Sequence, residues 1–92
     1  MKIAIIGTGN LGKSIAKGLI KNNAITSLYL TKRNLVQISE FEGYNNVTLT
    51  TDNQEAVKQS DIIIFAVQPA HFEPILHSIK SVLTENHVLI ST

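Results

Sequence analysis

The sequence contains no cysteine and no tryptophan, and only one methionine, two prolines and five tyrosine and phenylalanine residues together. The absence of cysteine excludes disulfides, thiolate metal sites and a cysteine nucleophile. Eight basic and seven acidic residues give a net charge of +1, which argues against a nucleic-acid-binding surface. No apolar run has the length of a membrane-spanning helix or of a signal-peptide core. We therefore expect a cytoplasmic protein that has neither membrane nor nucleic acid as a partner.

Predicted strands and helices alternate along the 92 residues, a length that suits one domain, residues 1–92. Residues 10–22 have the clearest helical periodicity, because Leu11, Ile15 and Leu19 recur every four residues. Residues 61–67 form the most apolar run and predict a central strand buried on both faces. The other predicted strands are residues 2–6, 28–31, 47–50 and 87–91, and the other predicted helices are residues 34–42, 52–59 and 70–83.

This alternation predicts an α/β fold built on a doubly wound parallel sheet of the Rossmann type. The strands should be parallel and joined by right-handed crossovers, and the strand order expected for this fold is 3-2-1-4-5. Within the last predicted helix, Pro74 would be tolerated only in the first turn. The fifth strand ends within one residue of the end of the sequence. We therefore expect the fold to be truncated before a sixth strand and a C-terminal domain.

Three glycines near the start, Gly7, Gly9 and Gly12, have G-x-G-x-x-G spacing between a predicted strand and a predicted helix. In this context the first glycine permits the tight turn, the second lets a pyrophosphate approach the backbone, and the third allows close packing of helix on strand. The helix N-terminus then offers free N–H groups to the phosphates. The motif predicts dinucleotide binding. The alternative is a turn whose glycines serve the backbone alone.

The stretch TKRN, residues 31–34, occupies the place where NAD-binding proteins carry an acidic residue. Here Lys32 and Arg33 stand between Thr31 and Asn34, and no carboxylate is near in the sequence. A guanidinium can bind the 2′-phosphate of NADP through two parallel hydrogen bonds, whereas a carboxylate would repel it. The sequence therefore favours NADP (as NADPH) over NAD. The alternative is an ordinary exposed basic turn.

Four stretches together resemble the N-terminal, cofactor-binding half of the pyrroline-5-carboxylate reductase family: IGTGNLGKSIAKGLI, TKRN, TTDNQEAVKQSDIIIFAVQP and ILHSI. The resemblance covers nearly the whole chain. It implies an oxidoreductase that reduces the cyclic imine pyrroline-5-carboxylate to proline with NADPH or NADH. One departure is Gln68, where the family usually has lysine. The substitution removes a positive charge near the nicotinamide and the substrate carboxylate.

The resemblance also implies which residues contact the cofactor. Asn10 and Leu11 would lie against the pyrophosphate, and Asn53 near the adenosine ribose. Thr31 and Arg33 would hold the 2′-phosphate, and residues 66–69 would line the nicotinamide side, at the carboxyl end of the central strand. The full set of predicted cofactor-binding residues is Gly7, Thr8, Gly9, Asn10, Leu11, Gly12, Thr31, Lys32, Arg33, Asn34, Asn53, Ala66, Val67, Gln68 and Pro69.

No residue of this chain is predicted to be catalytic or to bind a metal. Hydride comes from the cofactor, and in the family the substrate is held by a helical C-terminal domain that also makes the dimer. We therefore expect a cyclic imino acid as substrate and a homo-oligomer for the complete protein. His71, His77 and His87 lack metal-ligand spacing, which predicts surface or capping roles.

Two other functions stay open. One is a different NADP-dependent reductase or dehydrogenase with the same fold. The other is a non-catalytic nucleotide-sensing module, for which Gln68 is the supporting feature.

Overall fold

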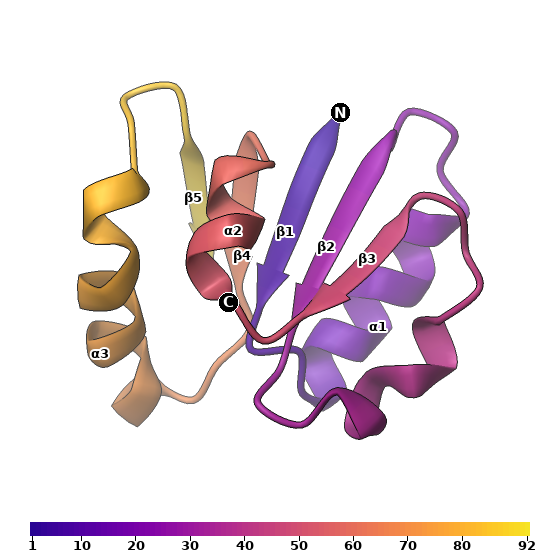
Figure 1. Cartoon of the computed structure of the whole chain (residues 1–92), viewed down its shortest axis with the longest axis horizontal. Helices are drawn as coiled ribbons and strands as arrows, with labels where there is room; N and C mark the ends of the chain where they lie inside the picture. Colours follow the sequence, from indigo (N-terminus) through magenta and orange to yellow (C-terminus); the bar gives the residue numbers. More distant parts are fainter.

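Five parallel strands form a single sheet in the order β3-β2-β1-β4-β5 in this computed structural model, which describes residues 1–92 (Figure 1). The order and the parallel pairing confirm the predicted doubly wound fold. The strands are β1 (Lys2–Ile6), β2 (Ser27–Thr31), β3 (Val47–Thr50), β4 (Ile62–Phe65) and β5 (Val88–Ser91).

Helical segments connect successive strands and cover both faces of the sheet. The α-helices are α1 (Asn10–Ile20), α2 (Asn53–Lys58) and α3 (Pro69–Ile79), and the 3₁₀ segments are η1 (Leu35–Phe41) and η2 (Lys80–Val82). In Figure 1, α2 lies in front of the sheet and α1 behind it. No helix combines the length and the apolar character needed to cross a lipid bilayer.

The central strand β1 supplies side chains to two separate cores. Ile3 and Ile5 belong to the cluster under α1 and η1, whereas Ala4 and Ile6 belong to the cluster under α2 and α3. Successive side chains of a strand point to opposite faces. A strand covered on both faces is therefore apolar at every position, which explains the unbroken run at residues 3–6.

The segment predicted as a helix over residues 34–42 is a kinked 3₁₀ segment. Leu35, Ile38 and Phe41 are three residues apart, and Ile38 and Phe41 are buried. A 3₁₀ helix has three residues per turn and so places these side chains on one face. Ile38 has non-helical angles (φ −121°, ψ 19°), which divide the segment into two short turns.

Several other predicted elements are one or two residues longer or shorter in the structure, and two differ more. The strand expected over residues 61–67 ends at Phe65, and residues 66–68 turn toward α3. The helix expected over residues 70–83 is α3 followed by the single turn η2. Pro74 lies in the second turn of α3, so the expectation that it needs the first turn was wrong. Both Pro74 and Ala70 are exposed, so the carbonyl that loses its helical partner can bond to water.

His87, for which a surface or capping role was predicted, bonds to two backbone groups. Its Nδ1 accepts a hydrogen bond from the Thr84 N–H at 3.0 Å, and its Nε2 donates to the Val57 carbonyl, also at 3.0 Å. The imidazole therefore joins the turn before β5 to the end of α2.

Ser60 gives a test of the packing between α2 and β4. It is buried, and its hydroxyl has no hydrogen-bond partner in the protein. An unpaired buried hydroxyl costs about 1–3 kcal/mol, so Ser60→Ala should stabilise the protein by about 1 kcal/mol. The melting temperature would then rise by about 4–8 °C. Ser81→Ala, at an exposed position, is the control and should leave the melting temperature unchanged. A lower melting temperature for Ser60→Ala would show that the hydroxyl is bonded in solution.

Candidate functional site

The candidate site lies at the carboxyl edge of the sheet, where all five strands end. The chain leaves β1 toward β2 on one side and reaches β4 on the other, so β1 and β4 border the point where the winding reverses. Ligands of open α/β sheets bind at this point. Three predicted groups meet here: the glycine turn (residues 7–12), the basic segment (residues 31–34) and residues 66–69 after β4.

Gly7 is required by both its conformation and its surroundings. Its φ is +74°, in the region that favours glycine. A Cβ built on Gly7 would lie 2.1 Å from Cγ1 of Val67. The end of β1 and the segment after β4 therefore touch at this residue, and no larger residue fits.

Thr31 holds the glycine turn from the end of β2. Its side-chain hydroxyl accepts a hydrogen bond from the Gly7 N–H at 3.0 Å, and its carbonyl accepts one from the Thr8 N–H at 2.8 Å. Thr31 and Thr8 are both buried. The side-chain hydroxyl of Thr31, a residue that the family resemblance assigns to the 2′-phosphate, is thus hydrogen-bonded inside the protein. This positioning role of Thr31 was missed by the sequence reasoning.

The start of α1 is open to an anion. Gly9 is the N-cap residue, no side chain caps the helix, and the first turn contains no acidic residue. The N–H groups of Asn10, Leu11 and Gly12 have no acceptor within the protein. Uncapped N–H groups at a helix N-terminus carry partial positive charge and bind phosphate.

Gly12 sets how closely α1 approaches the sheet. A Cβ at this position would lie 3.2 Å from both the Ala66 Cβ and the Ile5 Cγ2. Gly12 therefore lets α1 pack against the ends of β1 and β4, as the motif predicts.

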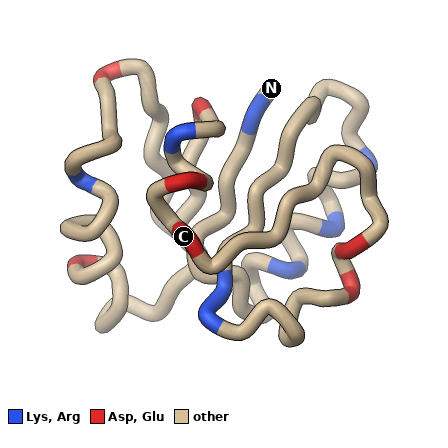
Figure 2. The backbone as a smooth tube through the Cα atoms, in the orientation of Figure 1, with Lys and Arg blue, Asp and Glu red and all other residues tan.

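The basic segment lies beside the glycine turn, at the lower edge of the sheet in Figure 2. Lys32 is half-buried, and Arg33 and Asn34 are exposed. Asn34 also caps η1, because its Oδ1 accepts a hydrogen bond from the Val36 N–H at 3.1 Å. Neither Lys32 nor Arg33 has a carboxylate within 4.0 Å.

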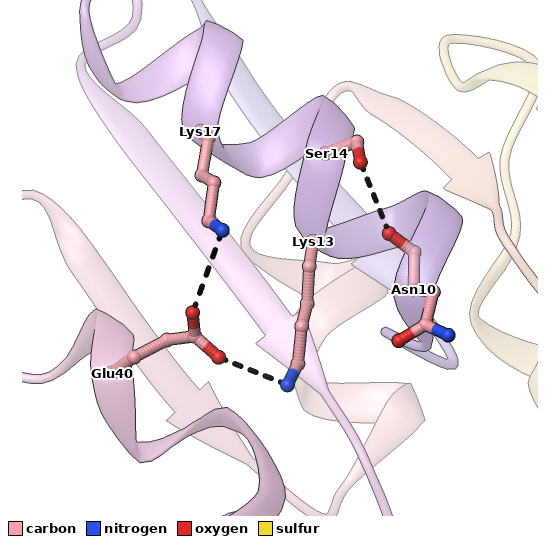
Figure 3. A network of polar contacts seen from close by, with 5 residues as sticks. All are labelled: Asn10, Lys13, Ser14, Lys17 and Glu40. Carbon is pink, nitrogen blue, oxygen red and sulfur yellow. Dashed lines mark hydrogen bonds and ion pairs between the residues drawn. The ribbon is translucent and has the colours of Figure 1, made fainter.

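Two lysines of α1 are paired with one carboxylate, Glu40 of η1 (Figure 3). Lys13 Nζ is 2.9 Å from Oε1 of Glu40, and Lys17 Nζ is 3.7 Å from Oε2. The hydrogen bond from Lys13, with the charges of both lysines, lowers the pKa of Glu40. The stabilisation from these pairs is thus complete above the unfolded-state pKa and is lost as the pH falls through the folded-state pKa. These ion pairs link η1, which follows Arg33, to α1, which begins at the glycine turn.

The carboxyl end of β4 borders a cavity of about 210 Å³. Its lining comprises Phe65, Val67, Pro69, Phe72, Ser91 and Thr92. Thr92 closes one side, with its hydroxyl donating to the Phe65 carbonyl at 2.7 Å. Val67 and Pro69 are among the predicted site residues, whereas Phe65, Phe72, Ser91 and Thr92 are not. The helical spacing of Phe72 indicated only a core position.

Asn53 and Gln68 each lie at or next to the start of a helix on the carboxyl edge. Asn53 is the first residue of α2, and Gln68 is the exposed N-cap residue of α3, where its side chain makes no capping bond. No group of three or more His, Cys, Asp or Glu side chains in the structure could hold a metal ion.

The chain is similar to known proteins over nearly its whole length. A family model described as NADP oxidoreductase, coenzyme F420-dependent, matches residues 2–92. The chain is 45% identical to pyrroline-5-carboxylate reductase 1 of Dictyostelium discoideum, over 97% of this chain and 16% of that protein.

Two solved structures have the same fold over almost the whole chain. A pyrroline-5-carboxylate reductase from Coxiella burnetii superposes with a TM-score of 0.87 and 29% identity, over 98% of this chain and 34% of that one. Plasmodium falciparum pyrroline carboxylate reductase with NADP bound superposes with a TM-score of 0.78 and 26% sequence identity, over 99% of this chain and 32% of that one. The chain thus spans about a third or less of the length of these proteins.

Proposed function

The chain belongs to the NADP oxidoreductase, coenzyme F420-dependent family, and from this premise we propose that residues 1–92 bind NADPH as the dinucleotide-binding domain of an imine reductase. The observation that carries the proposal is the open start of α1 at Gly9, beside a basic segment without a carboxylate partner. The proposed reaction is the reduction of pyrroline-5-carboxylate to proline, after the relatives that the chain resembles.

The residues present fit such a cofactor. A Cβ built on Gly9 would have only the Lys32 ammonium within 4 Å. This open space suits the approach of a pyrophosphate to the backbone. Arg33 is exposed and free of ion pairs, which suits a 2′-phosphate. We assign the adenosine ribose to Asn53 and the nicotinamide side to residues 66–69, beside the cavity at the end of β4. When bound, NADPH supplies the hydride, and this chain holds and orients it.

The substrate is proposed to be a cyclic imino acid, held in the complete enzyme by a helical domain beyond residues 1–92 that also forms a homo-oligomer. A cytoplasmic location belongs to the same proposal. The test is to incubate the complete protein with NADPH and pyrroline-5-carboxylate and follow the absorbance of NADPH. Consumption of NADPH with formation of proline supports the proposal. Binding of NADPH without turnover would favour a nucleotide-sensing protein, in keeping with the neutral Gln68.

Cofactor preference provides a second test. NADPH should bind several-fold more tightly than NADH, because Arg33 can pair with the 2′-phosphate. Arg33→Asp should weaken NADPH binding by about 10- to 100-fold, the loss expected for a charged hydrogen-bonded pair. NADH should be affected much less. Titration calorimetry with both dinucleotides measures the two affinities.

Lys2→Asp is the matched control, because Lys2 is exposed at the opposite, amino-terminal end of β1 and the charge changes equally. It should leave both affinities near their starting values. Parallel loss of NADPH and NADH binding in Arg33→Asp would reject Arg33 as the 2′-phosphate partner, and equal wild-type affinities would reject the preference itself.

A further inference from the structure

Lys32 lies over the glycine turn and not away from it. Its Nζ is 3.9 Å from the position that a Cβ on Gly9 would occupy. Its backbone continues the line of β2, with its N–H 3.4 Å from the Thr50 carbonyl. The half-buried side chain therefore reaches from the end of β2 to the start of α1, whereas the neighbouring Arg33 is exposed.

The charge of Lys32 is unbalanced in this position. Two lysines of α1, Lys13 in the first half of the helix and Lys17 in its last turn, share the carboxylate of Glu40. No carboxylate lies within 4.0 Å of Lys32. Its ammonium instead lies beside Gly9, the N-cap of α1, at the positive end of the helix dipole, where three N–H groups have no acceptor. A cation at a helix N-terminus is unfavourable unless an anion lies between them.

The two basic residues also differ in the anion that each one suits. A lysine ammonium is a compact point charge with rotatable donors, and it fits a phosphate approached from one side. A guanidinium presents a planar fork that matches a terminal phosphate with several free oxygens. In dinucleotide-binding domains of this type the pyrophosphate sits at the N-terminus of the first helix, and the ribose 2′ group is recognised near the end of the second strand. A bound dinucleotide would therefore place its pyrophosphate near Gly9 and a 2′-phosphate beyond the end of β2.

We propose that Lys32 binds the pyrophosphate, which NADP and NAD both carry, and that selection for the 2′-phosphate is left to Arg33. This inference rests on the proposed function. Lys32 and Arg33 are adjacent in the sequence, and the proposal gives them two different phosphates of the cofactor. Lys32 then contributes affinity without contributing preference.

The experiment measures NADPH and NADH binding to Lys32→Met by titration calorimetry. Both affinities should fall by about tenfold, the loss of one charged hydrogen bond, and their ratio should stay at the wild-type value. Lys32→Arg should recover part of the affinity for both. Lys21→Met, at the other end of α1, removes the same charge away from the site and should change neither affinity.

A loss confined to NADPH would overturn the proposal, since Lys32 would then serve the 2′-phosphate. Unchanged binding of both dinucleotides would also overturn it. If the wild-type protein bound neither dinucleotide, the proposed function itself would fail, and that result is distinct from both of these.

The salt dependence of NADH binding gives a second readout of the same pairing. The NADH affinity should decrease with salt concentration, because a cation pairs with the pyrophosphate. This salt dependence should be smaller in Lys32→Met and unchanged in Lys21→Met. An equal salt dependence in all three proteins would contradict the pairing.

Discussion

Replacing Gly7 with alanine should destabilise the protein by about 3 kcal/mol, which is a large part of the 5–15 kcal/mol typical of a domain. The left-handed conformation at Gly7 costs an alanine about 1–2 kcal/mol. The new Cβ would also overlap Cγ1 of Val67, and overpacking of this kind costs about 1–3 kcal/mol. Urea unfolding followed by circular dichroism measures the change.

Two other variants, Gly43→Ala and the double variant Gly7→Ala/Val67→Ala, separate these contributions. Gly43 has φ +92° and no atom within 4 Å of an added Cβ, so Gly43→Ala reports the conformational cost alone. Gly7→Ala combined with Val67→Ala removes the overlap and should recover part of the lost stability, after allowance for Val67→Ala alone. If Gly7→Ala were no more destabilising than Gly43→Ala, the contact with Val67 would not be the reason for glycine at position 7.

Replacing Gly9 with alanine should have the opposite pattern: a stable protein that no longer binds dinucleotides. Gly9 has φ −88°, which alanine adopts without strain, and its added Cβ would meet only Lys32 Nζ at an ordinary 3.9 Å. The methyl group would instead occupy the space through which the pyrophosphate reaches the N–H groups of α1. Loss of two such charged hydrogen bonds, at about 1.5–3 kcal/mol each, weakens binding by 100-fold or more.

Calorimetric titration should show this loss for both NADPH and NADH, whereas the urea midpoint should stay within error of the wild type. Gly18→Ala makes the same chemical change farther along α1, where an added Cβ meets nothing within 4 Å. Its affinities should equal those of the wild type. Normal binding by Gly9→Ala would mean that the pyrophosphate does not approach the backbone at Gly9.

The sheet could be predicted from the sequence because its two cores impose a simple pattern. β1 and β4 are covered on both faces and are apolar at successive positions, and α1 repeats apolar side chains at helical spacing. The 3₁₀ segment was predicted as a helix, although Leu35, Ile38 and Phe41 are spaced by three. That spacing fits a single face of a 3₁₀ helix, but in so short a segment it resembles part of an α-helical pattern.

The candidate site could be predicted less well than the fold, because the direction of each side chain determines which residues meet there. The sequence shows three neighbouring polar residues at positions 31–33. It does not show that the Thr31 side chain points inward to the Gly7 N–H, or that the Lys32 side chain extends to Gly9. The Glu40 pairs depend on the packing of η1 against α1, which the sequence does not specify. The cavity beside β4 combines residues far apart in the chain, such as Val67 and Thr92.

The central position of β1 has a consequence for how the chain folds during synthesis. β1 is synthesised before the other four strands of the sheet, yet its residue Ile3 pairs with Leu28 on one side and with Ile62 on the other. Parallel partners so far apart in sequence form contacts slowly. The β1 edge that pairs with β4 therefore stays unpaired until β4 has left the ribosome. During that interval the nascent chain presents an apolar strand edge, the kind of surface that chaperones bind and that aggregation begins from.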